Sequence, residues 1–194
     1  IDPATGRVTF TPNKDFVGTP DSISVQAKDA NGTPATAKYT PTVTPVTPTA
    51  EDVESTGKQG QEQTGKPTFN PGNPEVPMDD EVPATFEDGS TEKKVPGEGT
   101  YTVAPDGTVK FTPEKNFTGK GTGVTVKRVD KNGTEVTAKY TPTVTPVTPT
   151  ATPAESEAPQ GVVQTGTVTF TEGDPVAPID KDTITLLDEN GQPA

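Results

Sequence analysis

Apolar and polar residues alternate along several short stretches of this chain. Tyr101 and Val103 alternate with polar residues before the segment Pro-Asp-Gly at 105–107. Val109 and Phe111 continue the alternation after it. A period of two is typical of a strand with one buried face, and Asp-Gly supplies the positive φ that a tight turn requires. This stretch therefore predicts a β-hairpin.

A second, longer hairpin is predicted further along. Val124 and Val126 precede the segment Asp-Lys-Asn-Gly at 130–133, and the period of two then continues through Tyr140 to Val144. Asn-Gly suits two adjacent positive-φ positions, so we expect both residues to adopt them in the turn. Further strands are expected around Phe69 and Phe86, with an edge strand near Val95, and the pattern over 23–39 matches the second hairpin.

Apolar residues nowhere recur at helical spacing, and Thr and Val dominate where helix formers would be expected. The sequence therefore predicts an all-β fold, namely Ig-like antiparallel β-sandwich repeats joined by Thr/Pro-rich extended linkers.

The pattern repeats with a period of 101 residues. The fifteen residues TAKYTPTVTPVTPTA occupy both 36–50 and 137–151. Other matched positions are Phe16 and Phe117, Gly18 and Gly119, Gln63 and Gln164, and Phe69 and Phe170. A period near 100 residues is too long for one turn of a solenoid, but it suits one independently folding β-sandwich.

The repeated phrase has a proline at every third or fourth position over 41–48. Each proline removes a backbone donor and favours extended conformations, so we expect that the phrase cannot form a central strand, although the first few residues after Tyr39 can still finish an edge strand. The favoured state is a semi-rigid, polyproline-like spacer, with a flexible linker as the alternative.

These observations divide the chain into folded units, called beads, and the linkers between them. The boundaries are placed where the proline density rises. The expected division is the C-terminal half of a repeat at 1–44, a Thr/Pro and polar linker at 45–61, a complete repeat at 62–145, a linker at 146–162 and the N-terminal half of a repeat at 163–194. A different phase, in which residues 1–48 share a bead with the residues after them, is the less favoured alternative.

The composition narrows the possible partners. The chain has 16 Lys and Arg residues against 28 Asp and Glu, a net charge of −12, and no Cys or His. An acidic excess disfavours binding to nucleic acid and to anionic lipid. No apolar run approaches the roughly 20 residues of a membrane helix, so we expect no membrane insertion in this segment. Without Cys, stability must come from packing rather than from disulfides.

Two groups of acidic residues could ligate calcium. They are the run Met-Asp-Asp-Glu at 78–81 and the pair Asp180 and Asp182 in the third copy. The favoured interpretation is a solvated loop, because no complete calcium-binding loop is present. The three D-x-N-G strings that end at Gly32, Gly133 and Gly191 are likewise interpreted as turns rather than as calcium loops.

No catalytic constellation is visible in the sequence. Ser22, Ser55, Ser90 and Ser156 have no His to activate them, and the acids are expected to form a solubilising surface rather than a glycosidase pair. We therefore expect no enzyme, no cofactor, no metal and no catalytic residue, and the sequence names no ligand-binding residue. A buried isopeptide bond between a Lys and an Asn side chain is kept as an alternative. An intact mass lower by one ammonia would reveal it.

The repeat unit resembles a known family. The string V-x-F-T-P-x-x-x-F-x-G, then D-x-N-G-T and Tyr-Thr-Pro-Thr-Val, is similar to CshA-type fibril repeats, the tandem modules of long, wall-anchored streptococcal adhesins. The resemblance covers essentially the whole chain. It implies an extracellular, cell-wall-anchored surface fibril in which the repeats form the stalk and neighbouring repeats are the direct partners. Binding of fibronectin by such proteins is associated with a separate amino-terminal region.

Two functions follow as hypotheses. The first is a stalk or spacer module that holds an adhesive tip away from the wall. The second is a repeat that itself binds a host matrix protein such as fibronectin, weakly and multivalently. The second function needs an exposed aromatic or apolar patch, and most of the ten aromatic residues occupy positions predicted to face inward.

Overall fold

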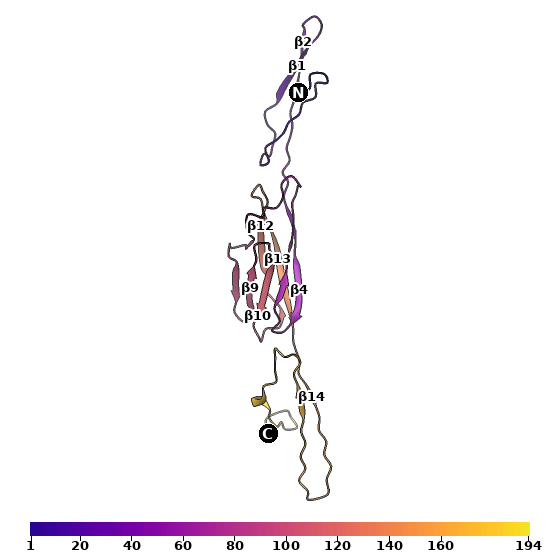
Figure 1. Ribbon diagram of the computed structural model, residues 1–194, viewed down its shortest axis with the longest axis vertical. Helices are drawn as coiled ribbons and strands as arrows, with labels where there is room; N and C mark the ends of the chain where they lie inside the picture. Colours follow the sequence, from indigo (N-terminus) through magenta and orange to yellow (C-terminus); the bar gives the residue numbers. More distant parts are fainter.

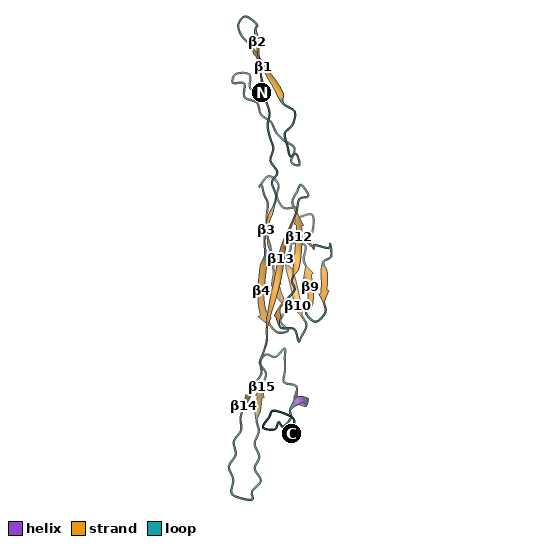
Figure 2. Ribbon diagram, turned by 180° about the vertical axis from the view of Figure 1, so that it is seen from behind, coloured by secondary structure: helices purple, strands orange, loops and turns teal.

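The computed structural model describes residues 1–194 and is elongated, with a central β-sandwich between two smaller bodies of paired strands (Figure 1). Strands concentrate in the middle of the molecule, and loops dominate both ends (Figure 2). The two termini lie towards opposite ends of the long axis. The predicted all-β class is confirmed, since the only helical element is the 3₁₀ turn η1 (Lys181–Thr183).

Fifteen strands follow one another along the chain. They are β1 (Ile23–Lys28), β2 (Pro34–Tyr39), β3 (Thr49–Glu51), β4 (Val53–Lys58), β5 (Gln63–Gly65), β6 (Thr68–Asn70), β7 (Thr85–Phe86), β8 (Glu92–Val95), β9 (Gly99–Val103), β10 (Val109–Pro113), β11 (Gly119–Lys120), β12 (Val124–Val129), β13 (Glu135–Thr145), β14 (Thr150–Thr152) and β15 (Thr169–Thr171). We call residues 49–145, which hold β3 to β13, the central sandwich.

Two sheets face each other in the central sandwich. One has the order β5-β10-β9-β8, and the other has the order β11-β13-β12-β7 with β4 paired to β13. All these pairings are antiparallel except that of β4 with β13, which is parallel. A small separate ladder joins β3 to β6. The expected edge strand near Val95 is confirmed as β8.

The core lies between these two sheets. Tyr101 packs against Phe111 within its own sheet, with ring centroids 4.5 Å apart, and against Tyr140 of the facing sheet at 6.3 Å. All three rings are fully buried. The valines at 109 and 126 are also fully buried, so the alternating apolar positions of both predicted hairpins form one core.

Both predicted hairpins are present, and Gly107 supplies the positive φ expected in the first turn, but the second turn differs from the expected type. Gly107 and Gly133 have φ of +90° and +78°, whereas no non-glycine residue has a positive φ. The preceding Asn132 therefore does not share the left-handed conformation, and the expectation of two adjacent positive-φ residues is wrong. Asp130 explains the difference, because its carboxylate accepts from the backbone N–H groups of Asn132 and Thr134 and holds a longer loop with one left-handed residue.

The expectation that the repeated phrase cannot form a central strand is wrong for its first half. β13 continues through Pro142 and Val144, which are buried, and these residues lie in a strand paired with β11 as well as with β4. Proline is tolerated there because residues 121–123 separate β11 from β12, so the ladder on that side is interrupted opposite it. The Pro142 carbonyl still accepts from the N–H of Gly121 at 2.8 Å.

The pairing of β3 and β4 also differs from the expected division of the chain. Residues 49–58, which were expected to belong to a linker, pair with β6 and β13 of the central sandwich. These strands are largely polar, so apolar alternation does not reveal them. In the second copy of the phrase, residues 146–149 lie between β13 and β14, hold two of its prolines and form no strand.

The two end bodies expose side chains that are buried in the central sandwich. In residues 1–43, β1 pairs with β2, and in residues 146–194, β14 pairs with β15. Tyr39 is 36% exposed, whereas Tyr140, at the same place in the identical phrase, is 0% exposed. Phe10 is likewise exposed whereas its counterpart Phe111 is buried, and Phe170 is exposed whereas its counterpart Phe69 is partly buried against the core. Each end body therefore contains only some of the strands that bury these positions in the central sandwich.

Gly123 gives a direct test of the packing beside β13. Its φ is +74°, and an added Cβ would overlap the carbonyl oxygen of Tyr140. We expect Gly123→Ala to lower the free energy of unfolding of the central sandwich by about 3 kcal/mol or more in urea denaturation followed by circular dichroism. Gly133→Ala is the control, because Gly133 has a similar φ and nothing within 4 Å, and it should cost about 1 kcal/mol. Equal losses would contradict the close approach at Gly123.

Candidate functional site

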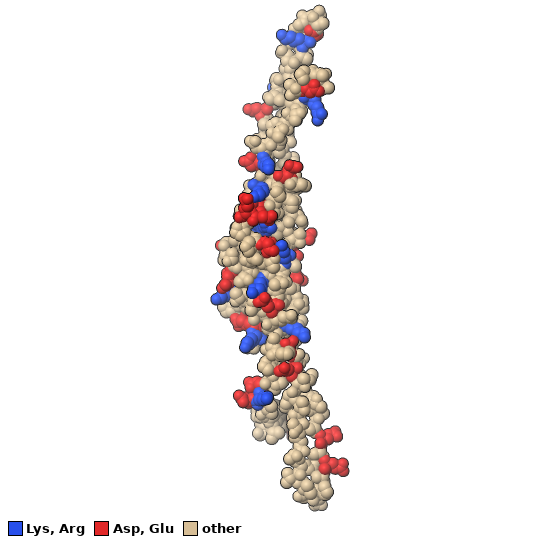
Figure 3. Space-filling view, viewed as in Figure 1, with Lys and Arg blue, Asp and Glu red and all other residues tan.

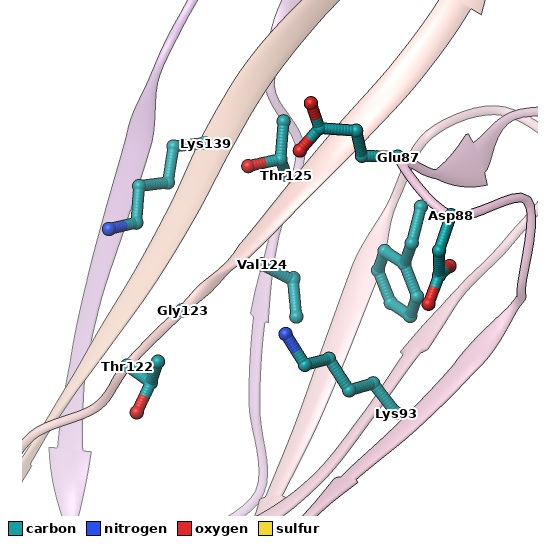
Figure 4. A pocket seen from close by; sticks show the side chains of 9 residues that line it. Glu87, Asp88, Lys93, Thr122, Gly123, Val124, Thr125 and Lys139 are labelled. Carbon is teal, nitrogen blue, oxygen red and sulfur yellow. The ribbon is translucent and has the colours of Figure 1, made fainter.

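A shallow groove of about 440 Å³ lies beside β7, β12 and β13 (Figure 4). Lys139 projects from β13 on one side of the groove, and Glu87 and Asp88 lie on the other. Hydrogen bonds from Ser90 lower the pKa of Asp88. A general acid in a glycosidase needs a raised pKa instead, so Asp88 does not have the property of that acid.

A buried carboxylate joins the two sheets at one edge of the sandwich. Glu98, just before β9, is 7% exposed. It accepts from the backbone N–H of Thr122 at 2.9 and 3.0 Å, from the Thr122 hydroxyl at 2.7 Å, and from the Tyr101 hydroxyl. The Tyr101 oxygen in turn accepts from the N–H of Gly123 at 3.2 Å. Burial, and then the hydrogen bond to Glu98, raise the pKa of Tyr101. The arrangement fixes β9 to the connection between β11 and β12.

A second polar cluster closes the sandwich where β4 meets β13. The Ser55 oxygen lies 2.6 Å from Gln63 Oε1 and 2.7 Å from the Tyr140 oxygen. An amide oxygen only accepts, so Ser55 donates to Gln63 and Tyr140 donates to Ser55. Gln63 Nε2 donates to the carbonyl of Thr143 at 3.1 Å. Burial raises the pKa of Tyr140. Three strands, β4, β5 and β13, are thereby tied together.

This second cluster was missed in the sequence, although a signal for it was present. Ser156 and Gln164 stand one period after Ser55 and Gln63, inside a segment that otherwise differs between the copies. Their side chains form the same bond, at 2.8 Å. A pair of polar residues kept at a spacing of eight inside a divergent stretch could have indicated a structural contact.

The acidic run at 78–81 is neutralised by neighbouring cations. Lys131 lies 2.6 Å from Asp79 and 3.4 Å from Glu81, and Arg128 lies 2.7 Å from Asp80. The hydrogen bond from Lys131 lowers the pKa of Asp79. No group of three or more Asp or Glu side chains is arranged to hold a metal ion. The run thus holds its loop to the second hairpin through ion pairs.

The other candidates from the sequence also make local structural bonds. Asp180 accepts from the N–H of Asp182 at the start of η1. Asp29, Asp130 and Asp188 each accept from backbone N–H groups two and four residues later, so the three D-x-N-G strings form the same turn. The four serines bond to neighbouring polar side chains, namely Ser22 to Thr40, Ser55 to Gln63 and Tyr140, Ser90 to Asp88, and Ser156 to Gln164.

The surface of the molecule carries both signs of charge. Acidic and basic side chains are distributed along the whole length of the face shown in Figure 3. Asp106 is an exposed example, and its pKa is lowered to about 2, first by the N–H of Thr108 and then by Lys66. The structure contains no apolar helix of membrane-spanning length.

Two comparisons relate the chain to known proteins. The sequence profile described as "Surface adhesin CshA repetitive domain" matches residues 1–43, 45–144 and 146–194, which is nearly the whole chain. The chain is similar to the NMR structure of repeat domain 13 of the fibrillar adhesin CshA from Streptococcus gordonii, with 67% sequence identity over 36% of this chain and 90% of that chain and a TM-score of 0.22. No curated protein matches it. The matched segments adjoin where one set of paired strands ends and the next begins.

Proposed function

This chain belongs to the family of CshA surface adhesin repeats, and from that premise we propose that its repeats are stalk modules, which project an adhesive tip from the bacterial wall. Each repeat acts as a spacer and contacts its neighbours in the chain. The protein that contains these repeats is anchored to the cell wall, and the repeats themselves carry out no catalysis.

The observation that carries this proposal is the direction of the first and last long strands of the central sandwich. β4 and β13 run parallel, with Val53 paired to Tyr140 and Lys58 paired to Thr145. A chain whose first and last strands are parallel enters at one end of the sandwich and leaves at the other (Figures 1 and 2). β13 alone has eleven residues, which span roughly 35 Å. Each repeat therefore adds its full strand length to the reach of the chain.

Small-angle X-ray scattering on the 194-residue chain tests this proposal. A compact globule of this length has a radius of gyration of about 16 Å. We expect a clearly larger radius, together with a long tail in the pair-distance distribution, because the three bodies follow one another along one axis. A concentration series serves as the control for association between molecules. A radius near the compact value would overturn the stalk proposal.

The alternative is that each repeat binds a host matrix protein such as fibronectin. The large aromatic side chains of the central sandwich are interior, with Phe86, Tyr101, Phe111 and Tyr140 all buried, so they do not offer the exposed aromatic anchor of a typical binding hot spot. Surface plasmon resonance of the chain against immobilised fibronectin separates the two functions. The stalk proposal expects no saturable binding, and saturable binding would favour the alternative.

A further inference from the structure

The pair formed by β4 and β13 is placed where tension along the chain would act. β4 comes soon after the chain enters the central sandwich, and β13 ends where the chain leaves it. The pairing covers the whole of β4, from Val53 to Lys58, against residues 140–145. No other pairing in the central sandwich joins a strand so close to the entry with the strand at the exit.

Side-chain and terminal bonds reinforce this pair at both of its ends. At the entry end, the N–H of Lys139 donates to the Asp52 carboxylate at 2.7 Å. At the exit end, the Thr145 hydroxyl donates to the Gly57 carbonyl at 3.1 Å, and the N–H of Gln59 donates to the Thr145 carbonyl at 2.8 Å. The cluster of Ser55, Gln63 and Tyr140 lies between these two ends. The pair is therefore held along its full length.

We propose that the β4–β13 pair is a mechanical clamp, the element of each repeat that resists tension along the fibril. The proposal rests on the stalk function in that it supposes such tension. Pulling the two ends of the chain apart draws β4 towards the entry end and β13 towards the exit end. The two strands must then slide past each other along their length. Backbone hydrogen bonds that lie across the strands are loaded together in this geometry instead of one after another.

The rest of the sandwich carries little tension while the β4–β13 pair is intact. The short ladder of β3 and β6, with three residue pairs from Thr49 to Glu51, is loaded first, and its release leaves β4 and β13 joined. The core hairpin of β9 and β10 lies between β4 and β13 in the sequence, so no tension reaches it until the clamp has opened. Opening the clamp then releases about 300 Å of chain in one step.

Pulling the same protein in two directions tests the clamp. The chain has no Cys, so introduced cysteines are unique attachment points for single-molecule handles. One variant carries Glu51→Cys and Thr145→Cys, which load the pair in shear. The matched variant carries Lys58→Cys and Thr145→Cys, whose sites are register partners at the exit end and peel the pair open. All three positions are exposed, and urea denaturation checks that both variants are equally stable.

At one pulling speed, we expect the rupture force in shear to be several times the force in the peeling direction, since forced unfolding follows the barrier and not the equilibrium stability. Equal forces in the two directions would overturn the clamp. This result is independent of the scattering test, because a repeat can be strong in one direction whether or not it serves in a stalk, and an elongated chain can lack a clamp.

A side-chain variant tests how the second polar cluster, formed by Ser55, Gln63 and Tyr140, contributes to the clamp. Ser55→Ala removes the hydroxyl that joins Gln63 to Tyr140, and we expect a lower rupture force in shear with the peeling force nearly unchanged. Ser156→Ala is the matched control, because Ser156 stands one period later and bonds only to Gln164. A shear force that is the same in Ser55→Ala as in the unmodified chain would contradict the role assigned to this cluster.

Discussion

Tyr140→Ala is expected to lower the free energy of unfolding of the central sandwich by about 3–5 kcal/mol. The Tyr140 ring is fully buried against Tyr101, and its hydroxyl bonds to Ser55. Truncating a buried aromatic side chain costs about 3–5 kcal/mol, and the loss of the bond that the Tyr140 hydroxyl donates to Ser55 adds to this cost. A domain of this size has a free energy of unfolding of only about 5–15 kcal/mol. Urea denaturation followed by circular dichroism measures the loss.

The chain supplies its own control for this variant. Tyr39 lies in the same fifteen-residue sequence, but it is 36% exposed and belongs to the N-terminal body. Tyr39→Ala should therefore leave the unfolding transition of the central sandwich unchanged. Similar losses from both variants would mean that the local sequence, and not the packing around Tyr140, determines the stability.

Glu98→Ala is expected to lower the free energy of unfolding of the central sandwich by about 3 kcal/mol. The substitution removes the acceptor for the N–H and hydroxyl of Thr122, and it leaves the fully buried Tyr101 hydroxyl without its acceptor. Hydrogen bonds to a charged group contribute more than neutral ones, and unsatisfied buried donors are costly. Thermal unfolding followed by circular dichroism, together with urea denaturation, checks the value.

Two further variants make the Glu98 prediction specific. Glu98→Gln keeps the shape and one acceptor oxygen, so we expect an intermediate loss. Glu92→Ala removes a carboxylate from β8 that is exposed and forms a 3.5 Å ion pair with Lys94, and it should change stability by less than about 0.5 kcal/mol. If Glu98→Ala cost no more than Glu92→Ala, the buried carboxylate would not join the two sheets as described.

The sequence was sufficient to predict the strands that carry the core. Tyr101, Phe111, Val126 and Tyr140 are buried and alternate with polar residues, so the period of two located β9, β10, β12 and most of β13. The same reasoning found the edge strand β8. β9, β10 and β12 each bury one face, and the apolar pattern records that burial.

The remaining features depend on contacts that the local sequence does not record. β4 exposes one face, and its half-buried positions are Val53, Ser55 and Gly57, so it lacks an apolar stripe. Gly57 is needed because a Cβ there would lie 2.9 Å from the Gln63 side chain, a residue of another strand. Pro142 fits into β13 only because residues 121–123 interrupt the neighbouring ladder. The second polar cluster likewise joins Ser55 and Gln63 to Tyr140, which lies in a strand far from them in the sequence.

The pairing of β4 with β13 also determines when a repeat can fold during synthesis. Val53 and Tyr140 are about 90 positions apart, and ribosomes add roughly 5–20 residues per second, so β4 waits for several seconds before its partner emerges. Most of β13 lies in the repeated fifteen-residue phrase, which has the same sequence in successive copies. The sequence of this strand therefore cannot distinguish one repeat from the next. The order of emergence from the N to the C terminus distinguishes the repeats instead. β4 of each repeat can pair with β13 before the first strand of the following repeat appears. Chains that are denatured and then released all at once lose this ordering in time.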